Sequence, residues 1–426
     1  MVAPTLGISI KSTYKIMGTE FLARAKRLRP FVSRAEPSEV TVLDALTLSE
    51  IIVTFSAALT TPYLAYYGYM RRYMRVASRN AESRKQRARV SVIICTLNAK
   101  DAIEKKLEEV LHQNYPLELM EVIVVDGGSK DGTIEILQGL RERINSKVRL
   151  IVVEDHGFRS KASQINEGIH VASGDYVITT DADCGMRADS IETLVNTLSA
   201  DQVGAVCSRQ VLTNPNESLN TETEVTYRNY YEKIRIAESN LHSTPIYHGG
   251  LSAYRKAALS RIDEDVNADD TQLAIAAIRN GYRALYEFES VYYTKAPSSP
   301  RQTWSQRVRR GQGLQRVFWR NCRMITAKQF DGFGFPILAA EFYMHIISPL
   351  LFMVTAALFA IWVVLLISDL VLFSPLILTL AILMYWKRDW SPVLFLASFV
   401  YYQIALFCAM ILHLLGHNYS RWSRCG

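Results

Sequence analysis

The hydrophobic positions of the chain change their spacing along its length. Between Arg89 and about Ser298, short runs rich in Val and Ile alternate with segments whose apolar residues recur at helical spacing. The expected strands are 90–95, 121–125, 148–153 and 176–180, and the expected helices between them are 103–111, 133–140 and 161–171. Strands that alternate with helices at intervals of roughly 30 residues indicate βαβ units and a largely parallel α/β sheet.

Other hydrophobic runs are too long and too uniform to be strands of such a sheet. Residues 346–368 run for about 23 positions without a charge, enough for a helix to cross a hydrocarbon core of roughly 30 Å. Two further apolar runs follow at 370–386 and 391–412, and the aromatic and basic residues between them suit a membrane interface. We therefore expect three C-terminal membrane crossings.

Two upstream apolar segments are less uniform. Residues 51–70 are about 20 uncharged residues that include several Thr and Ser and Pro62, and we predict a crossing here, with a buried or interfacial helix as the alternative. Residues 335–345 contain Pro336 and Glu341 and are expected to form an interfacial helix rather than a further crossing. Polar residues in such runs usually snorkel or pair locally.

Charge is distributed unevenly along the 426 residues, which carry a net charge of +7. Residues 71–89 hold eight basic residues and one acid, and residues 301–323 hold seven arginines and no acid. The positive-inside rule places the first stretch and the α/β domain in the cytoplasm, although the basic N-terminal arm would then lie outside if 51–70 crosses. Because the second stretch adjoins apolar helices, its expected anion is a lipid headgroup or a diphosphate, and not nucleic acid.

Composition excludes several classes of protein. With 49% apolar and 21% charged residues, the chain is neither wholly disordered nor fibrous. Its six cysteines are scattered without a CxxC pair, which argues against a disulfide framework or a zinc site and favours a reducing compartment. The expected organisation is a basic arm (1–45), a transmembrane helix (46–70), a basic linker (71–89), an α/β domain (90–300), Arg-rich and interfacial helices (301–345), about three transmembrane helices (346–416) and a tail (417–426).

Polar residues gather at the carboxyl ends of the expected strands, where parallel α/β sheets bind ligands. The first to fourth strands are followed in turn by Thr96 and Asn98, by Asp126, by Asp155 and His156, and by Asp181 and Asp183. Two carboxylates two residues apart at a strand end would suit Mg²⁺ or Mn²⁺ carrying a diphosphate, with a solvated turn as the alternative. The glycine-containing segment 126–133 is equally compatible with a simple βα loop.

Two later segments also carry candidate chemistry. His248, Gly249 and Gly250 form a flexible loop before a short ordered run, and a β-turn is the alternative interpretation. Asp269 and Asp270 begin a helix of apolar periodicity. An acidic residue is stabilised there by the unpaired backbone amides of the first turn and by the helix dipole. One carboxylate suffices for capping, so the second is free for chemistry.

Together, these motifs resemble those of the membrane-bound family 2 glycosyltransferases with a GT-A fold, which include cellulose, chitin and hyaluronan synthases and ceramide glucosyltransferases. The resemblance extends from Ser91 to about Arg320, over more than half of the chain, in a fixed order of short motifs. The matching pieces are 90–98, 124–133, 161–168, 174–183, 269–273 and 306–311.

The resemblance implies a role for each candidate residue. An Mg²⁺ or Mn²⁺ ion would be the cofactor, and a general base would deprotonate the acceptor hydroxyl for in-line attack that inverts the anomeric carbon. The base would be Asp270 and the metal ligand Asp183; the nucleotide and donor would contact Thr96, Asn98, Asp126, Asp155, Lys161, Asp181, Gln306, Arg309 and Arg310; and His248, Gly249, Gly250 and Asp269 would lie on the acceptor side.

The last motif departs from the family pattern Gln-x-x-Arg-Trp, because Arg310 stands where tryptophan is expected. That tryptophan belongs to the acceptor site of processive synthases, which puts polymer formation in question here. We expect a membrane-embedded inverting enzyme with a cytoplasmic catalytic domain, which uses a nucleotide-sugar, in first place a UDP-sugar, and a glycan or lipid hydroxyl. The alternatives are a polyprenyl- or dolichyl-phosphate sugar synthase and a non-catalytic membrane scaffold that retains the fold.

Overall fold

The computed structural model describes residues 39–76, 87–154, 157, 160–365 and 391–417. Contacts divide the chain into two units, one of residues 1–54 and 357–373, and the other of residues 55–356 and 374–426. The described part of the first unit comes from helices α2 (Glu39–Met70) and α11 (Ser348–Leu365). The sheet and every candidate site residue belong to the second unit.

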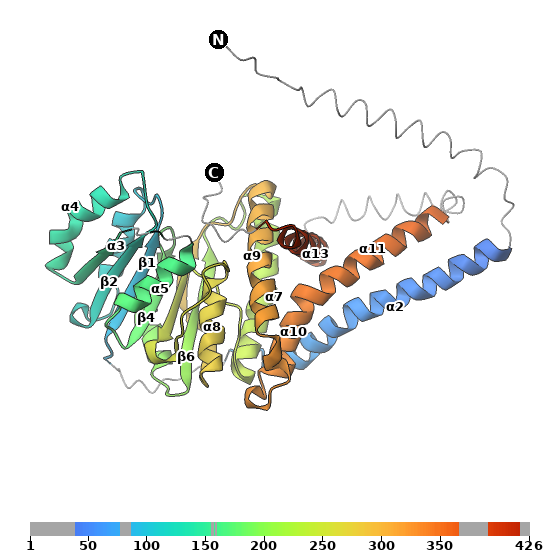
Figure 1. The fold of residues 1–426 in the computed structure, drawn as a ribbon, viewed down its shortest axis with the longest axis horizontal. Coiled ribbons are helices and arrows are strands. Elements are labelled where there is room, and N and C mark those ends of the chain that lie inside the picture. The colour runs from blue at the N-terminus through green and yellow to red at the C-terminus, as the bar shows by residue number, and fades with distance from the viewer. Residues whose placement is uncertain (1–38, 77–86, 155–156, 158–159, 366–390, 418–426) are drawn as a thin grey trace, which may run out of the picture. The chain divides into compact units, whose positions relative to one another are not determined.

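The second unit is built on a mixed sheet whose described strands follow the order β3-β2-β1-β4-β7-β6-β8-β5 (Figure 1). Four strands pair in parallel, as the sequence predicts: β3 (Arg149–Val153), β2 (Met120–Asp126), β1 (Val90–Thr96) and β4 (Tyr176–Asp181). The remaining strands are β7 (Leu251–Arg255), antiparallel to β4 and β6 (Val203–Leu212), then β8 (Arg283–Thr294), parallel to β6, and β5 (Gly185–Met186), antiparallel to β8.

Helices cover both faces of the sheet, so β1 and β2 are buried along their whole length and read as continuous apolar runs. One face packs against α3 (Ile103–Leu111), α4 (Thr133–Asn145) and α6 (Ser190–Leu198). The other packs against α5 (Lys161–Val171), α7 (Leu219–Leu241) and α8 (Asp269–Arg279). This arrangement leaves the strand ends as the place where polar side chains can meet a ligand.

The register of the parallel strands places the predicted polar residues together. Thr96 at the end of β1 lies opposite Asp126, and Cys95 lies opposite Asp181. The expectation that the carboxyl ends of β1, β2 and β4 share one edge is therefore confirmed.

In the described part of the chain, three helical stretches are long and apolar enough to cross a membrane: Thr47–Tyr73, Gly334–Leu365 and Val393–Leu414. The first contains the predicted run 51–70, and the third, within helix α13 (Ser391–Leu414), covers all but the first two residues of the predicted run 391–412. The predicted crossing at 370–386 lies outside the described residues.

The segment 335–345, predicted to be an interfacial helix, is helical and continuous with α11, and its interfacial position stays a prediction. It continues into α11 through the π-helical turns Gly334–Leu338 and Tyr343–Ile347, which flank α10 (Ala339–Phe342). The carboxylate of Glu341 is buried and lies 3.2 Å from His345 Nδ1 one turn later. His345 Nδ1 also lies 2.9 Å from the Glu341 backbone carbonyl, so the two polar residues lie together inside the helical stretch.

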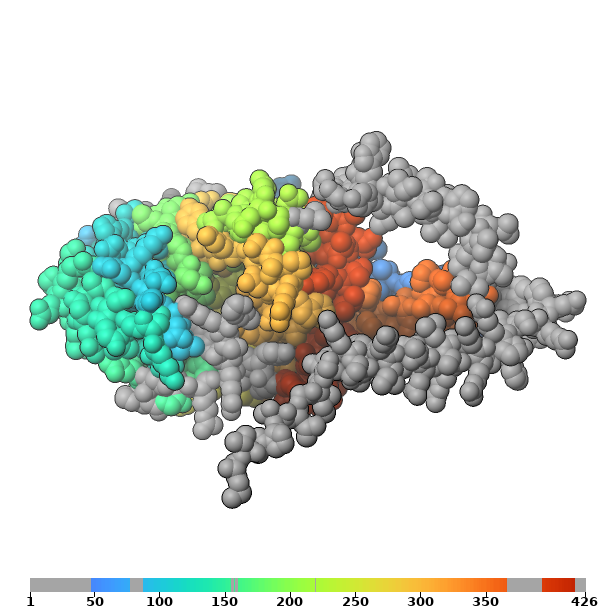
Figure 2. Space-filling model, turned by 90° about the horizontal axis from the view of Figure 1, so that it is seen from above, coloured from blue at the N-terminus to red at the C-terminus, as the bar shows by residue number. Residues whose placement is uncertain are grey.

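Helix α9 (Pro300–Arg320) lies against α13, one of the candidate membrane helices (Figures 1 and 2). Close approach depends on Gly311, where an added Cβ would meet Leu406 Cδ2 at 2.8 Å. Arg307 donates to the Glu224 carboxylate on α7 at 2.5 Å, and both side chains are buried. The Arg-rich stretch 301–323 is therefore not uniformly available to anions, because at least one of its arginines forms a buried ion pair.

Candidate active site

A cleft of about 380 Å³ opens at the ends of β1 and β4, beside the first turns of α5 and α8. Most of the predicted residues line it, although they come from distant parts of the sequence. They are Thr96, Lys161, Asp181, Asp183, His248, Gly249, Gly250, Asp269, Asp270, Gln306, Arg309 and Arg310.

Lys161 links two carboxylates at the centre of the cleft. Its Nζ donates to Asp181 Oδ1 at 2.5 Å and lies 3.6 Å from Asp269 Oδ2. Burial opposes the charge of this ammonium, but Asp181 and Asp269 raise the pKa of Lys161 well above its usual value. The start of α5 is fixed by a capping box between Ser160 and Ser163, so Lys161 enters the cleft from a rigid position.

Asp270 is the carboxyl whose electrostatics best suit proton transfer. Burial and then the neighbouring Asp269 raise the pKa of Asp270 to about 7, against the opposing effect of Arg310 and Lys161. Its Oδ1 accepts the Thr271 amide at 2.8 Å, which orients the carboxyl in the first turn of α8. A base that titrates near neutral pH can both accept and release a proton there.

Gly249 keeps open the space between the charged groups. A Cβ at this position would lie 3.1 Å from Lys161 Nζ, 3.8 Å from Asp181 Oδ2 and 3.9 Å from Asp270 Oδ2. The next glycine, Gly250, packs directly on the Tyr292 ring, where a Cβ would meet a ring carbon at 2.1 Å. The loop 248–250 thus brings backbone to the centre of the cleft where a side chain would block it.

The strand end after β4 offers a set of metal ligands. Ligand atoms of Asp181, Asp183 and Cys184 lie within 4.8 Å of one another. Burial raises the pKa of the Cys184 thiol, so it remains protonated and is a poor ligand, whereas the carboxylates are the hard oxygen ligands that Mg²⁺ and Mn²⁺ prefer. The residues therefore fit such an ion, and Asp183 is exposed at the rim where an ion could enter.

Two predicted nucleotide contacts organise a loop instead of lining the cleft. The Asp126 carboxylate accepts the amides of Gly128 at 2.9 Å and Ser129 at 2.8 Å, and also the Thr96 hydroxyl at 3.1 Å. Asn98 has a φ of 53° and its Oδ1 accepts the Lys130 amide at 2.8 Å. Their role toward a nucleotide stays a prediction, and Asp155 lies outside the described residues.

Comparisons with known proteins agree with this architecture. Residues 91–263 match the family described as glycosyl transferase family 2. The poly-beta-1,6-N-acetyl-D-glucosamine synthase of Staphylococcus aureus strain MSSA476 is 27% identical over 236 residues, and that of Staphylococcus epidermidis is 26% identical over 238 residues. Each match covers 54% of this chain and 56% of the relative, so the similarity spans about half the length of these relatives.

A solved structure matches over a greater length. The mannosyltransferase of Pyrobaculum calidifontis, in complex with GDP-Man and Mn²⁺, is 29% identical, with a TM-score of 0.70, and the match covers 87% of this chain and 99% of that one. This chain is a family 2 glycosyltransferase. The predicted family and the GT-A fold are confirmed.

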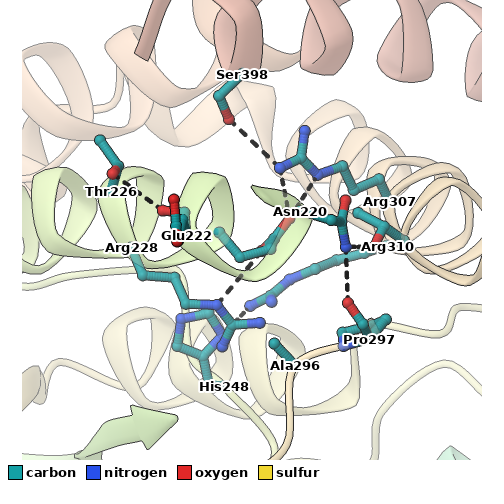
Figure 3. A network of polar contacts seen from close by, with 12 residues as sticks. Asn220, Glu222, Thr226, Arg228, His248, Ala296, Pro297, Arg307, Arg310 and Ser398 are labelled. Atoms are coloured by element: carbon teal, nitrogen blue, oxygen red, sulfur yellow. Dashed lines mark hydrogen bonds and ion pairs between the residues drawn. The ribbon is translucent and has the colours of Figure 1, made fainter. Parts of the chain in front are cut away.

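In this glycosyltransferase, the departure at Arg310 is accommodated by a specific contact. Arg310 Nη2 donates to the Tyr247 carbonyl at 3.1 Å and contacts His248 Nδ1 (Figure 3). Burial, followed by the positive charge of nearby arginines, lowers the pKa of His248 well below its usual value, so the imidazole is neutral and Nδ1 can accept. The cation is thereby held at the position where the family pattern has an aromatic ring.

Sequence reasoning missed several polar residues that the glycosyltransferase places at the cleft. Lys106 is 1% exposed, and its Nζ donates to Thr180 Oγ1 at 3.1 Å and to the Cys184 carbonyl, which supports the turn that carries Asp183. Lys106 lies behind the cleft wall, whereas the missed residues that line the cleft include Arg228, Asn267, Tyr292 and Lys295. Arg228 and Arg235 stand seven positions apart and so share a face of α7, a spacing that could have indicated a common partner.

Proposed function

We propose that the glycosyltransferase moves a sugar, with inversion of its anomeric carbon, from a nucleotide-sugar to a hydroxyl of a lipid or glycan. The observation that carries this proposal is the placement of Asp270. This carboxyl, with a pKa of about 7, faces an open point that Gly249 preserves beside the Lys161–Asp181 ion pair. A base thus stands next to a cationic group, as displacement of an anionic leaving group requires.

The reaction is a single displacement. The acceptor hydroxyl gives its proton to Asp270 while its oxygen forms a bond to the anomeric carbon. The bond from that carbon to the diphosphate oxygen breaks, and its electron pair leaves with the nucleoside diphosphate. Lys161 and Arg309, which both line the cleft, favour the negative charge that develops on this leaving group.

Asp181 and Asp183 would hold the divalent ion. When bound, Mg²⁺ or Mn²⁺ would neutralise part of the charge on the diphosphate. The Mn²⁺ in the Pyrobaculum mannosyltransferase complex supports this assignment, as does the carboxylate donor set of this chain.

The donor belongs to the nucleoside diphosphate sugars. The structural neighbour was solved with GDP-Man, whereas the curated relatives are named as synthases of an N-acetyl-D-glucosamine polymer. The resemblance favours a UDP-sugar, and both nucleotides belong in the assay. Arg310 at the family's tryptophan position supports a single transfer more than polymer growth.

The enzyme is proposed to be embedded in a membrane with the catalytic domain on the cytoplasmic side. Three described helical stretches are long and apolar enough to span, and residues 71–89 carry the basic excess that marks the cytoplasmic end of such a helix.

Asp270→Asn tests the proposal in purified full-length protein supplied with radiolabelled UDP- and GDP-sugars and membrane lipids. Sugar transfer is expected to be lost while donor binding persists, because the amide keeps the shape but cannot accept the proton. Asp101→Asn, at an exposed position before α3, is the matched control and should transfer normally. Full transfer by Asp270→Asn would refute the assignment of the base and would favour a phosphate nucleophile that needs no base.

A further inference from the structure

A second, smaller cavity of about 80 Å³ adjoins the catalytic cleft between α7, α9 and α13. The two spaces share Arg228, His248, Gln306, Arg310 and Leu314 in their linings. The volume exceeds that of several water-sized probes and would admit a compact polar group. We refer to this space as the arginine cavity.

The arginine cavity carries an excess of positive charge. Four arginines line it, and Glu224 is the sole carboxylate among its described lining residues. Glu224 is already engaged, since it accepts from Arg307 at 2.5 Å and from Arg228 at 3.4 Å. His248 is neutral, as its lowered pKa requires, and therefore adds no charge. Four guanidinium groups thus share one carboxylate, and Arg235 is buried with no carboxylate partner of its own among the described lining residues, a costly arrangement which indicates that an anion belongs in this space.

Unpaired donor atoms point to the same conclusion. In the described structure, Arg228 Nη1 and Arg235 Nε are fully buried and have no hydrogen-bond partner. The whole Arg235 residue is only 7% exposed. The hydroxyl of Tyr292, a residue of the adjoining cleft lining, is likewise buried without a partner. Buried donors of this kind are normally satisfied, so a ligand with several acceptor oxygens would complete them.

The arginine cavity lies on one particular side of the catalytic base. Of the residues predicted to contact the donor or the metal, most line the cleft but not the cavity, namely Thr96, Lys161, Asp181, Asp183 and Arg309, whereas Gln306 and Arg310 line both. His248 also lines both and directly precedes Gly249, whose open point faces Asp270. Figure 3 shows Arg228 from α7 and Arg310 from α9 converging on His248 at this junction. An anion in the cavity would therefore sit beside the acceptor rather than beside the donor diphosphate.

We propose that the arginine cavity binds a phosphate group of the acceptor, next to the hydroxyl that Asp270 deprotonates. The inference rests on the proposed function and names its acceptor class. Phosphate suits the cavity because its oxygens can accept from several guanidinium groups at once. The phosphate can come from a phospholipid headgroup or from a soluble sugar or polyol phosphate. His345 and Tyr402, from the candidate membrane helices, form part of the wall and favour the lipid source.

The test uses purified full-length enzyme with the sugar donor that gives turnover. The lipid acceptors are phosphatidylinositol or phosphatidylglycerol, compared with neutral diacylglycerol, each in phosphatidylcholine vesicles. The soluble acceptors are glycerol 3-phosphate and, for comparison, glycerol. In each comparison, transfer to the phosphate-bearing acceptor is expected to exceed transfer to the neutral one by at least about 10-fold, the scale of one charge-assisted hydrogen bond. Preference for the lipid or for the soluble phosphate identifies the source. Equal use of neutral and phosphate-bearing acceptors would overturn the proposal.

Variants separate binding from structural support. Arg235→Gln should raise the acceptor KM by about 10- to 100-fold for phosphate-bearing acceptors, leave donor KM and kcat near their normal values, and abolish competition by inorganic phosphate. Arg261→Gln, an exposed arginine outside both spaces, is the control and should change none of these values. If Arg235→Gln does not fold, Arg228→Gln and phosphate competition with the wild-type enzyme give the decision. Absence of phosphate competition in the wild type would refute the inference, whereas absence of all donor turnover would refute the proposed function itself.

Discussion

The protonation of Asp270 gives a quantitative prediction for the pH dependence of sugar transfer. The base must be ionised to accept a proton, and burial with Asp269 raises the pKa of Asp270 from 3.8 to about 7. A raised carboxyl pKa means that the active, ionised form is lost as pH falls through about 7. At roughly 1.36 kcal/mol per pH unit, this difference means that ionising Asp270 costs about 4 kcal/mol more in the folded protein than in water.

The magnitude follows from simple titration. With a pKa of about 7, roughly one tenth of the enzyme is ionised at pH 6 and nine tenths at pH 8. The value of kcat/KM, which reports on the free enzyme, should therefore rise about 10-fold between these pH values. An ordinary aspartate, with a pKa of about 3.9, would give almost no change over this range.

The assay measures initial rates of transfer from a radiolabelled nucleotide-sugar in mixed buffers of constant ionic strength, with the metal ion held saturating. Asp269→Asn removes the like charge beside the base, so the acidic limb should move to lower pH and the ratio between pH 8 and pH 6 should shrink. Asp101→Asn should leave the profile unchanged. A flat profile from pH 6 to pH 8 in the wild type would refute the reasoning about Asp270.

Three further predictions concern other parts of the molecule. Gly249→Ala should strongly reduce transfer because the new Cβ would lie 3.1 Å from Lys161 Nζ. Gly139→Ala on α4, where a Cβ would have nothing within 4 Å, should transfer normally and have a slightly higher Tm. Normal transfer by Gly249→Ala would argue against the open point at this glycine. Treatment with EDTA should abolish transfer, and added Mn²⁺ or Mg²⁺ should restore it in the wild type but not in Asp183→Asn. Activity that survives chelation would contradict the proposed metal role. Burial, together with Glu341, raises the pKa of Glu238 well above its usual value, so the folded protein holds a proton on this carboxyl. Its stability therefore falls as pH rises above the pKa of the unfolded chain. Glu238→Gln should raise Tm at pH 8 more than at pH 5, and an equal or opposite change would contradict a protonated Glu238.

Local sequence pattern was sufficient for the first half of the sheet. Runs such as 90–95 and 121–125 are apolar because both faces of β1 and β2 are covered, and βαβ connections leave few choices of neighbour. The second half required pairing between distant segments. Strand β7 inserts antiparallel between β4 and β6, an arrangement that no local periodicity specifies.

The candidate site divides in a similar way. Asp181, Asp183 and Asp270 could be found because carboxylates at strand ends or helix starts stand out against apolar neighbours. Arg228 and Arg235 were missed, because their seven-residue spacing shows a shared face of the helix but charges on a polar helix usually mark a solvated face. Arg235 is buried and Arg228 half-buried because α7 packs against α13 and is joined to α9 by the Glu224–Arg307 ion pair, which depends on tertiary packing alone.

The anomeric configuration of the product distinguishes a single displacement from a double one. A single displacement with Asp270 as base must deliver the sugar with the configuration opposite to that of the donor. NMR of the product formed from an α-linked nucleotide-sugar is therefore expected to show a β-linkage. A product that retains the α-configuration would contradict the account.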